Sequence, residues 1–235
     1  HNGMVNVNGQ KMSKSLKNFT TIRDLLDSGT SPMTLRYFVL TVNYRKPLDF
    51  TDEALKSASE AWKNINVALS FFDITKKENL SIEVNETNEF VEETYKDMIN
   101  YEISQKKIKF TNALNNDLNT AGAIAIIYEL AKPLKNFINQ FQRIKNLEIN
   151  TNEKFHLRET FKTLEELTDV LGLKKEEIKI ENRINEDQIL SLINKRLIAK
   201  KEKDYAEADK IRNSLKEKGV ELIDQSPELT TWVRI

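Results

Sequence analysis

The sequence contains no cysteine, which excludes a disulfide framework and a zinc site built on thiolates. Its two histidines, His1 and His156, are far apart and form no histidine cluster, so we predict no metal site on this chain. The sequence also lacks a run of about 18 apolar residues. Its first residues show neither the basic start nor the apolar stretch of a signal peptide. These absences predict a soluble cytoplasmic protein that binds no membrane.

Glycine and proline are scarce, with six and four residues among 235. A chain built of many short strands and tight turns needs more of both, so we expect a mainly α-helical fold. The content of 39% hydrophobic and 31% charged residues fits an ordinary soluble protein. Its length allows one sizeable core or two smaller ones.

No charge of one sign dominates, because 36 basic side chains balance 36 acidic ones. The whole-chain charge therefore does not indicate a nucleic-acid-binding protein. The segment 195–218 is different, with nine basic and five acidic residues, a local excess of four. Taken alone, this excess is more typical of a solvated helix face than of an RNA-binding surface.

Local signals define the first fifty residues. Residues 4–9 alternate apolar and polar side chains and end in Asn-Gly, which predicts a short strand entering a turn, and 11–18 is a polar loop. Thr21 and Asp24 form a capping-box pattern at the start of a helix. Ser31 followed by proline predicts a second helix start. The proline-containing stretch 43–50 interrupts this pattern, so we place a boundary near residue 50.

Apolar residues at helical spacing predict four further helices, which pack most economically as an antiparallel bundle. Their apolar positions span 55–72, 90–114, 124–141 and 157–171. The second of these either continues or restarts within its span, and Pro133 should kink the third. After a charged linker at 174–185, two shorter helices and a β-hairpin at 220–234 predict a small α+β module.

The loop Lys11-Met12-Ser13-Lys14-Ser15 carries the clearest chemical signal. Two ammonium groups and two hydroxyls lie within five residues, directly before a predicted helix. Lysines act as compact positive charges for phosphate oxygens, and serine hydroxyls and loop amides add hydrogen-bond donors. This composition suits phosphate handling, although it is also common in solvated surface loops.

The order of these five residues resembles the signature loop of class I aminoacyl-tRNA synthetases. The flanking residues narrow the resemblance to the cysteinyl-tRNA synthetase family, whose pattern is H-N-G-M followed by G-E-K-M-S-K-S-L-G-N-F. Gln10 replaces the usual glutamate and Lys17 the usual glycine. Further stretches resemble landmarks of that family in the same order: 35–38, 44–50, 113–120, 204–212 and 230–232.

The resemblance implies three parts. Residues 1–50 are expected to be the end of a Rossmann catalytic domain with stem-contact helices, 51–175 a tRNA-binding helical bundle, and 183–235 a small anticodon-binding domain. The implied reaction is ATP-dependent activation of cysteine and its transfer to tRNA(Cys), with Mg²⁺ accompanying the nucleotide. ATP is expected to bind at Lys11, Met12, Ser13, Lys14 and Ser15, with Lys14 tied most directly to ATP and Lys11 stabilising pyrophosphate. We expect a monomer.

The same resemblance implies that the family's H-I-G-H nucleotide motif and its zinc site lie upstream of these residues. Zinc is therefore expected only in that absent N-terminal half, and the chain alone should not activate cysteine.

Seven residues are candidates for contact with tRNA. They are Arg36 and Arg45 in the stem-contact region and Lys200, Lys201, Tyr205, Asp224 and Trp232 in the C-terminal module. An aromatic ring among lysines can stack on an unpaired base, and a carboxylate can accept hydrogen bonds from base amino groups. Each residue also has a structural alternative: ion pairing for the two arginines, a solvated helix face for the two lysines, capping for Asp224, core packing for Trp232, and an ordinary helix position for Tyr205.

Two other functions remain open. The chain can be a stand-alone tRNA-binding module, or a relative that ligates cysteine to an amino sugar. The latter is expected to lack the anticodon module, so the segments around Tyr205 and Trp232 argue against it. The intact mass of the natural gene product separates the enzyme from the stand-alone module.

Overall fold

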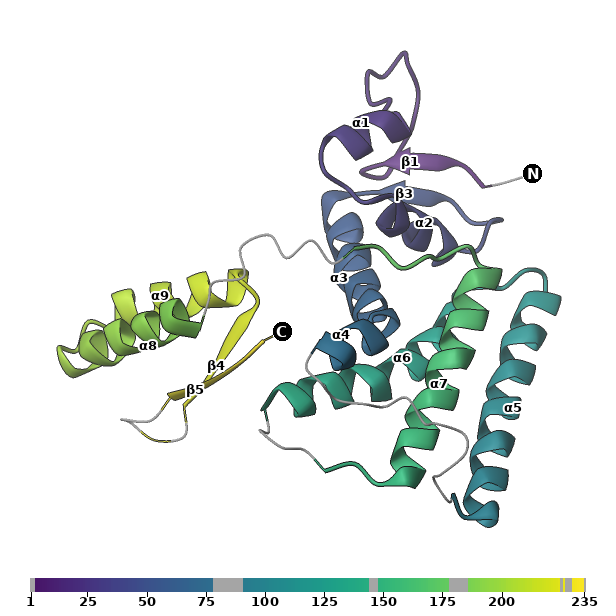
Figure 1. Cartoon of the computed structure of the whole chain (residues 1–235). Helices are drawn as coiled ribbons and strands as arrows, with labels where there is room; N and C mark the ends of the chain where they lie inside the picture. The colour runs from purple at the N-terminus through teal and green to yellow at the C-terminus, as the bar shows by residue number, and fades with distance from the viewer. Residues whose placement is uncertain are drawn as a thin grey trace. The chain divides into compact units, whose positions relative to one another are not determined.

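The computed structural model describes residues 3–77, 91–143, 148–177, 186–224, 226 and 230–234. Within these residues the chain forms nine helices and five short strands, which confirms the mainly α-helical prediction. The chain divides into two compact units (Figure 1). One comprises 1–135 and 149–177, and the other comprises 136–148 and 178–235. None of the helices described is long and apolar enough to cross a bilayer.

The first unit begins with a three-stranded sheet of order β2-β1-β3. Strands β1 (Val5–Val7) and β2 (Gln10–Lys11) are antiparallel and joined by the predicted Asn8-Gly9 turn, with φ of 51° and 77°. The Asp49 carboxylate accepts the Gly9 amide at 3.0 Å and holds this turn. Strand β3 (Leu48–Phe50) pairs in parallel with β1, a contact that the sequence did not predict.

Helices α1 (Ile22–Asp27) and α2 (Pro32–Leu40) start where the capping signals predicted. Thr21 and Asp24 form the reciprocal capping box, and the Ser31 hydroxyl accepts the Thr34 amide at 3.0 Å. Helix α1 has no buried residue, whereas α2 buries Leu35, Tyr37 and Phe38. The loop before α1 therefore precedes an exposed helix, and α2 anchors the segment to the core.

The helical part consists of α3 (Asp52–Leu69), α4 (Phe71–Lys77), α5 (Glu93–Asn115), α6 (Thr120–Arg143) and α7 (Thr151–Val170). The prediction of a single helix through residue 72 was wrong, because the chain leaves the helical conformation at Ser70. There the Ser70 hydroxyl bonds the Asn66 carbonyl, and Phe71 and Phe72 turn onto Phe161. Helix α5 runs without a restart, and α6 passes through Pro133 without ending.

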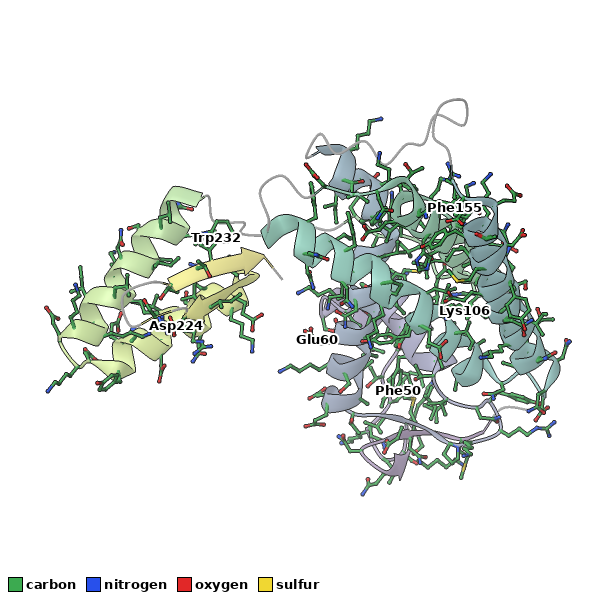
Figure 2. The ribbon with its side chains drawn as sticks, turned by 90° about the horizontal axis from the view of Figure 1, so that it is seen from below. Phe50, Glu60, Lys106, Phe155, Asp224 and Trp232 are labelled. Carbon is green, nitrogen blue, oxygen red and sulfur yellow. The ribbon has the colours of Figure 1, made fainter. Side chains whose placement is uncertain are left out.

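Helices α5 and α7 pack side by side and run in the same direction (Figure 1). Lys106 in α5 pairs with Glu129 in α6 at 3.3 Å, and Lys107 pairs with Glu166 in α7. Ile99, near the start of α5, and Phe155, near the start of α7, lie in the same buried hydrophobic cluster. Phe155 is labelled in Figure 2. These contacts confirm the helical bundle.

The segment after α7 folds back over α2 and α3. The Glu176 carboxylate accepts hydrogen bonds from the Ser31 hydroxyl at 3.0 Å and from the Trp62 indole at 2.7 Å. The Asn66 side chain bonds both backbone groups of Glu176, at 2.9 and 3.1 Å. The start of the predicted linker is therefore fastened to the first unit as far as Glu176.

The second unit contains α8 (Glu186–Lys201), α9 (Tyr205–Glu217) and an antiparallel hairpin of β4 (Val220–Asp224) and β5 (Thr230–Arg234). The hairpin register pairs Leu222 with Trp232. Its core is formed by six buried aliphatic residues, Ile189, Ile193, Ile211, Leu215, Val220 and Leu222. The predicted small α+β module is confirmed.

Candidate functional site

The loop between β2 and α1 places the lysine–serine motif on the surface. The Met12 amide donates to the Val5 carbonyl at 2.9 Å, which extends the β1–β2 hairpin to the start of the loop. Beyond it, the Ser13 hydroxyl lies 3.1 Å from the Ser15 hydroxyl and accepts the Leu16 amide at 3.3 Å. The loop is thus compact, and its hydroxyls already bond within it.

The two lysines of this loop carry uncompensated charge. Among the residues that the structure describes, neither Lys11 nor Lys14 forms an ion pair, and both are exposed or nearly so. The Lys14 ammonium lies 5.8 Å from the centre of the Phe19 ring, within cation–π distance. Two ammonium groups without a carboxylate partner, in a loop that also carries two serine hydroxyls, can bind phosphate oxygens.

Arg45, a predicted tRNA contact, is held by a carboxylate from another part of the chain. Its guanidinium makes two parallel hydrogen bonds to Asp117, at 2.7 and 2.8 Å, and the Tyr44 hydroxyl adds a third at 2.7 Å. The hydrogen bonds from Arg45, and then from Tyr44, lower the pKa of Asp117 to about 2. This cluster joins the loop after α2 to the loop between α5 and α6, and Arg45 keeps 65% of its side chain exposed.

Arg36, the other predicted contact of this region, binds the end of α7. Its Nε donates to the Leu171 carbonyl at 2.7 Å. A Cβ at Gly172 would lie 2.5 Å from the guanidinium, and Gly172 has φ of 64°, so glycine suits this position on both grounds. A cation at a helix C-terminus stabilises the helix through its dipole, which gives Arg36 a structural role.

In the C-terminal module, two predicted tRNA contacts bind each other. Asp224 accepts from Lys200 at 3.1 Å and from the Thr230 hydroxyl at 2.7 Å. It also receives a bidentate pair of hydrogen bonds, at 2.8 and 2.9 Å, from Arg196, which is only 2% exposed. The guanidinium of Arg196, above all, holds the pKa of Asp224 far below its usual range.

Sequence reasoning missed Arg196, although a signal was present. Arg196 follows Ile189 and Ile193 at helical spacing, so it occupies a core position of α8. A charge at such a position requires a partner, because an isolated buried charge is strongly unfavourable. Asp224 is that partner.

Tyr205, Lys201 and Trp232 occupy different environments. Tyr205 is the first residue of α9, just after the N-cap Asp204, and is 64% exposed. Lys201 is exposed at the end of α8. Trp232, labelled in Figure 2, is half-buried and packs against the module's aliphatic core. The structure thus leaves Tyr205 and Lys201 accessible and gives Trp232 a packing role.

Comparison with known proteins shows what the chain is similar to. A family model described as the catalytic domain of class I (C) tRNA synthetases matches residues 1–60, and the DALR domain model matches 109–175. A cysteine–tRNA ligase of Prochlorococcus marinus subsp. pastoris is 98% identical over 235 residues, which are all of this chain and 48% of the relative. Over its whole length, this chain is similar to part of a cysteine–tRNA ligase. A ligase of Prochlorococcus marinus strain MIT 9515 is 93% identical over the same shares of both chains.

A more distant member of the cysteine–tRNA ligase family also matches the whole length of this chain. The ligase of Synechococcus sp. strain CC9902 is 43% identical over 242 residues, covering the whole chain and 48% of the relative. The chain therefore spans about half the length of the curated relatives it matches. The catalytic-domain match contains the lysine–serine loop and Arg45, and the DALR match contains Asp117. The Arg45–Asp117 cluster thus connects the two matched regions.

The described residues contain no group of three or more histidine, aspartate or glutamate side chains placed to hold a metal ion.

Proposed function

We propose that this chain provides the ATP loop and the tRNA-binding part of a cysteine–tRNA ligase. The enzyme activates cysteine with ATP and transfers it to tRNA(Cys). The observation that carries the proposal is the 98% identity over all 235 residues to a protein named as that ligase. The exposed, unpaired lysines of the loop support it, because activation develops negative charge on phosphate.

In the activation step, the cysteine carboxylate attacks the α-phosphorus of ATP, and the bond to pyrophosphate breaks. Lys14 and Lys11 stabilise the charge that develops on the transferring and leaving phosphates. Met12, Ser13 and Ser15 complete the candidate ATP site. Mg²⁺ is the expected partner of the nucleotide. The other half of the ligase is expected to bind cysteine and its selecting zinc, so the chain alone is expected to be inactive.

For tRNA, the accessible side chains are the direct candidates. Tyr205 offers a ring for base stacking and Lys201 a charge for phosphate. Arg45 retains an exposed face while bound to Asp117. Arg36, Lys200, Asp224 and Trp232 are engaged within the protein, and they support the surface on which RNA would lie. We further propose a cytoplasmic monomer.

Two alternatives make different predictions. A stand-alone tRNA-binding module would bind tRNA without a catalytic half. A ligase for an amino sugar would not need the C-terminal module, yet the relatives named above as cysteine–tRNA ligases match the chain through that module. The tRNA ligase is therefore favoured.

The test is an assay of the full-length protein that contains this chain. We expect ATP–pyrophosphate exchange that depends on cysteine, and cysteine transfer to tRNA with the cysteine anticodon. Serine and alanine serve as control amino acids. Exchange without transfer to tRNA would favour another acceptor, and the absence of both would refute the proposal.

A further inference from the structure

The side chain of Asn18 spans the lysine–serine loop. Its Oδ1 accepts the Ser13 amide at 2.9 Å, and its Nδ2 donates to the Lys11 carbonyl at 3.1 Å. One carboxamide therefore binds the backbone on both sides of Met12. This pair of bonds reproduces what a neighbouring strand would supply, on the edge of β2 that does not pair with β1.

The rest of the loop is held by weaker or strained features. The Lys17 amide donates to the Lys14 carbonyl at 3.2 Å, closing a turn. Lys17 itself has φ of 53°, a left-handed conformation that is unfavourable for a residue with a Cβ. Such a turn persists only where other contacts hold it, and the bonds of Asn18 are the contacts that close the loop across its base.

We propose that Asn18 is a positioning residue for the ATP loop, fixing the backbone from which Lys11 and Lys14 project. The inference rests on the proposed function. The loop must hold two ammonium groups at set places, because catalysis by charge stabilisation requires donors that are already oriented. Asparagine suits the task because one short, neutral side chain offers both an acceptor and a donor. Alanine offers neither, and glutamine places both one methylene further out.

The first test needs no catalytic activity. Trypsin cleaves after lysine, and the loop contains Lys11, Lys14 and Lys17. Cleavage after Lys14 in the full-length protein, followed by mass spectrometry, reports how often the loop opens. We expect Asn18→Ala to be cleaved roughly tenfold faster than the parent, and Asn18→Gln to be cleaved at a rate between those of the parent and Asn18→Ala. The exposed control Asn213→Ala should be cleaved at the parent rate.

The second test separates positioning from mere loop stability. We expect Asn18→Ala to lower kcat for cysteine-dependent ATP–pyrophosphate exchange about 10- to 100-fold, with partial recovery in Asn18→Gln. If Asn18 acts by placing Lys14, the same substitution made in a Lys14→Ala protein should change kcat by less than about twofold.

The outcomes are distinct. Equal fold losses in the parent and Lys14→Ala backgrounds would overturn the inference, as would faster cleavage with unchanged kcat. If Asn18→Ala is cleaved after Lys14 at the parent rate, Asn18 does not hold the loop, and the inference is overturned. If the parent protein shows no exchange at all, the proposed function fails, and the trypsin result alone decides whether Asn18 holds the loop.

Discussion

Some charged side chains described in the first unit are ion-paired, whereas neither of the two loop lysines forms an ion pair with a described residue. Lys106, Lys107 and Lys175, for instance, each contact an acidic side chain. An ammonium group that is already paired must lose that partner before it binds phosphate, whereas a free one exchanges only water. The lysines of the motif are therefore ready to bind an anion.

The first residue-level prediction concerns Lys14. Lys14→Ala in the full-length protein should reduce cysteine-dependent ATP–pyrophosphate exchange about 100-fold, the effect of losing roughly 3 kcal/mol of transition-state stabilisation. Binding of tRNA should change little, because the loss concerns the phosphates of ATP. The exposed helix residue Lys63, changed to alanine, is the control. Equal losses in exchange and tRNA binding would remove Lys14 from the ATP chemistry.

A second residue-level prediction uses the cluster around Asp117. Its carboxyl should titrate with a pKa of about 2, as measured by NMR of the side-chain carbon. In Arg45→Met, the largest stabilising hydrogen bonds are lost, so this pKa should rise towards the ordinary value of about 3.9. Tyr44→Phe should give a smaller rise. An unchanged titration in Arg45→Met would show that the guanidinium does not bind Asp117 in solution.

At the scale of elements, the sequence predicted what nearby residues decide. The helix starts at Thr21 and Ser31 and the turn at Asn8 depend on a few residues, and the structure has them where expected. Strand β3 was missed because its pairing with β1 joins residues about forty positions apart. The break at Ser70 was missed because the apolar spacing continues through it, while a hydrogen bond and aromatic packing redirect the chain.

The features of the candidate site likewise differ in whether nearby residues of the sequence decide them. The lysine–serine motif is contiguous, so sequence alone located it. The hydrogen bonds of Asn18 across the loop and the pairing of Arg45 with Asp117 depend on side-chain geometry, which sequence spacing does not reveal. Asp224 was expected to contact RNA, whereas in the structure it binds Arg196, Lys200 and Thr230. Whether it also meets a base stays a prediction.

The Arg196–Asp224 pair gives a prediction for the C-terminal module. Because the folded-state pKa of Asp224 is lowered, its ionised form stabilises the module above the unfolded pKa of about 3.9. That contribution is lost as pH falls through the folded pKa. Asp224→Asn should therefore lower the free energy of unfolding at pH 7 by about 2 kcal/mol. This figure already allows for solvent screening, because one third of the Asp224 side chain is exposed.

The measurement is urea unfolding followed by Trp232 fluorescence, with Trp62→Phe in every variant so that Trp232 alone reports. The difference between parent and Asp224→Asn should narrow below about pH 4, since the parent then loses the advantage of its charge. The exposed Glu202, changed to glutamine, is the control within the same module. A difference that stays constant from pH 7 to pH 3 would contradict the assignment.

For the whole molecule, a formal charge of zero means that long-range attraction does not bring RNA to the chain. Any RNA binding must come from local surfaces. In the segment around α8 and α9, Lys200 and Arg196 are occupied by Asp224, so the charge available to phosphate is smaller than the sequence count suggests. Few phosphate contacts imply a shallow dependence of affinity on salt, and a larger share of binding from stacking.

The 235-residue chain itself should show this behaviour with an RNA stem-loop carrying the cysteine anticodon. Lys201→Ala should flatten the slope of log affinity against log salt by about 0.7, the effect of one phosphate contact with single-stranded RNA. Tyr205→Ala should weaken binding by about 1 to 3 kcal/mol at every salt concentration without changing the slope, because stacking involves no counterion release. Lys63→Ala, in the other unit, should match the parent. If Tyr205→Ala binds as tightly as the parent, the exposed ring of Tyr205 does not stack on a base, and the first turn of α9 has only a packing role.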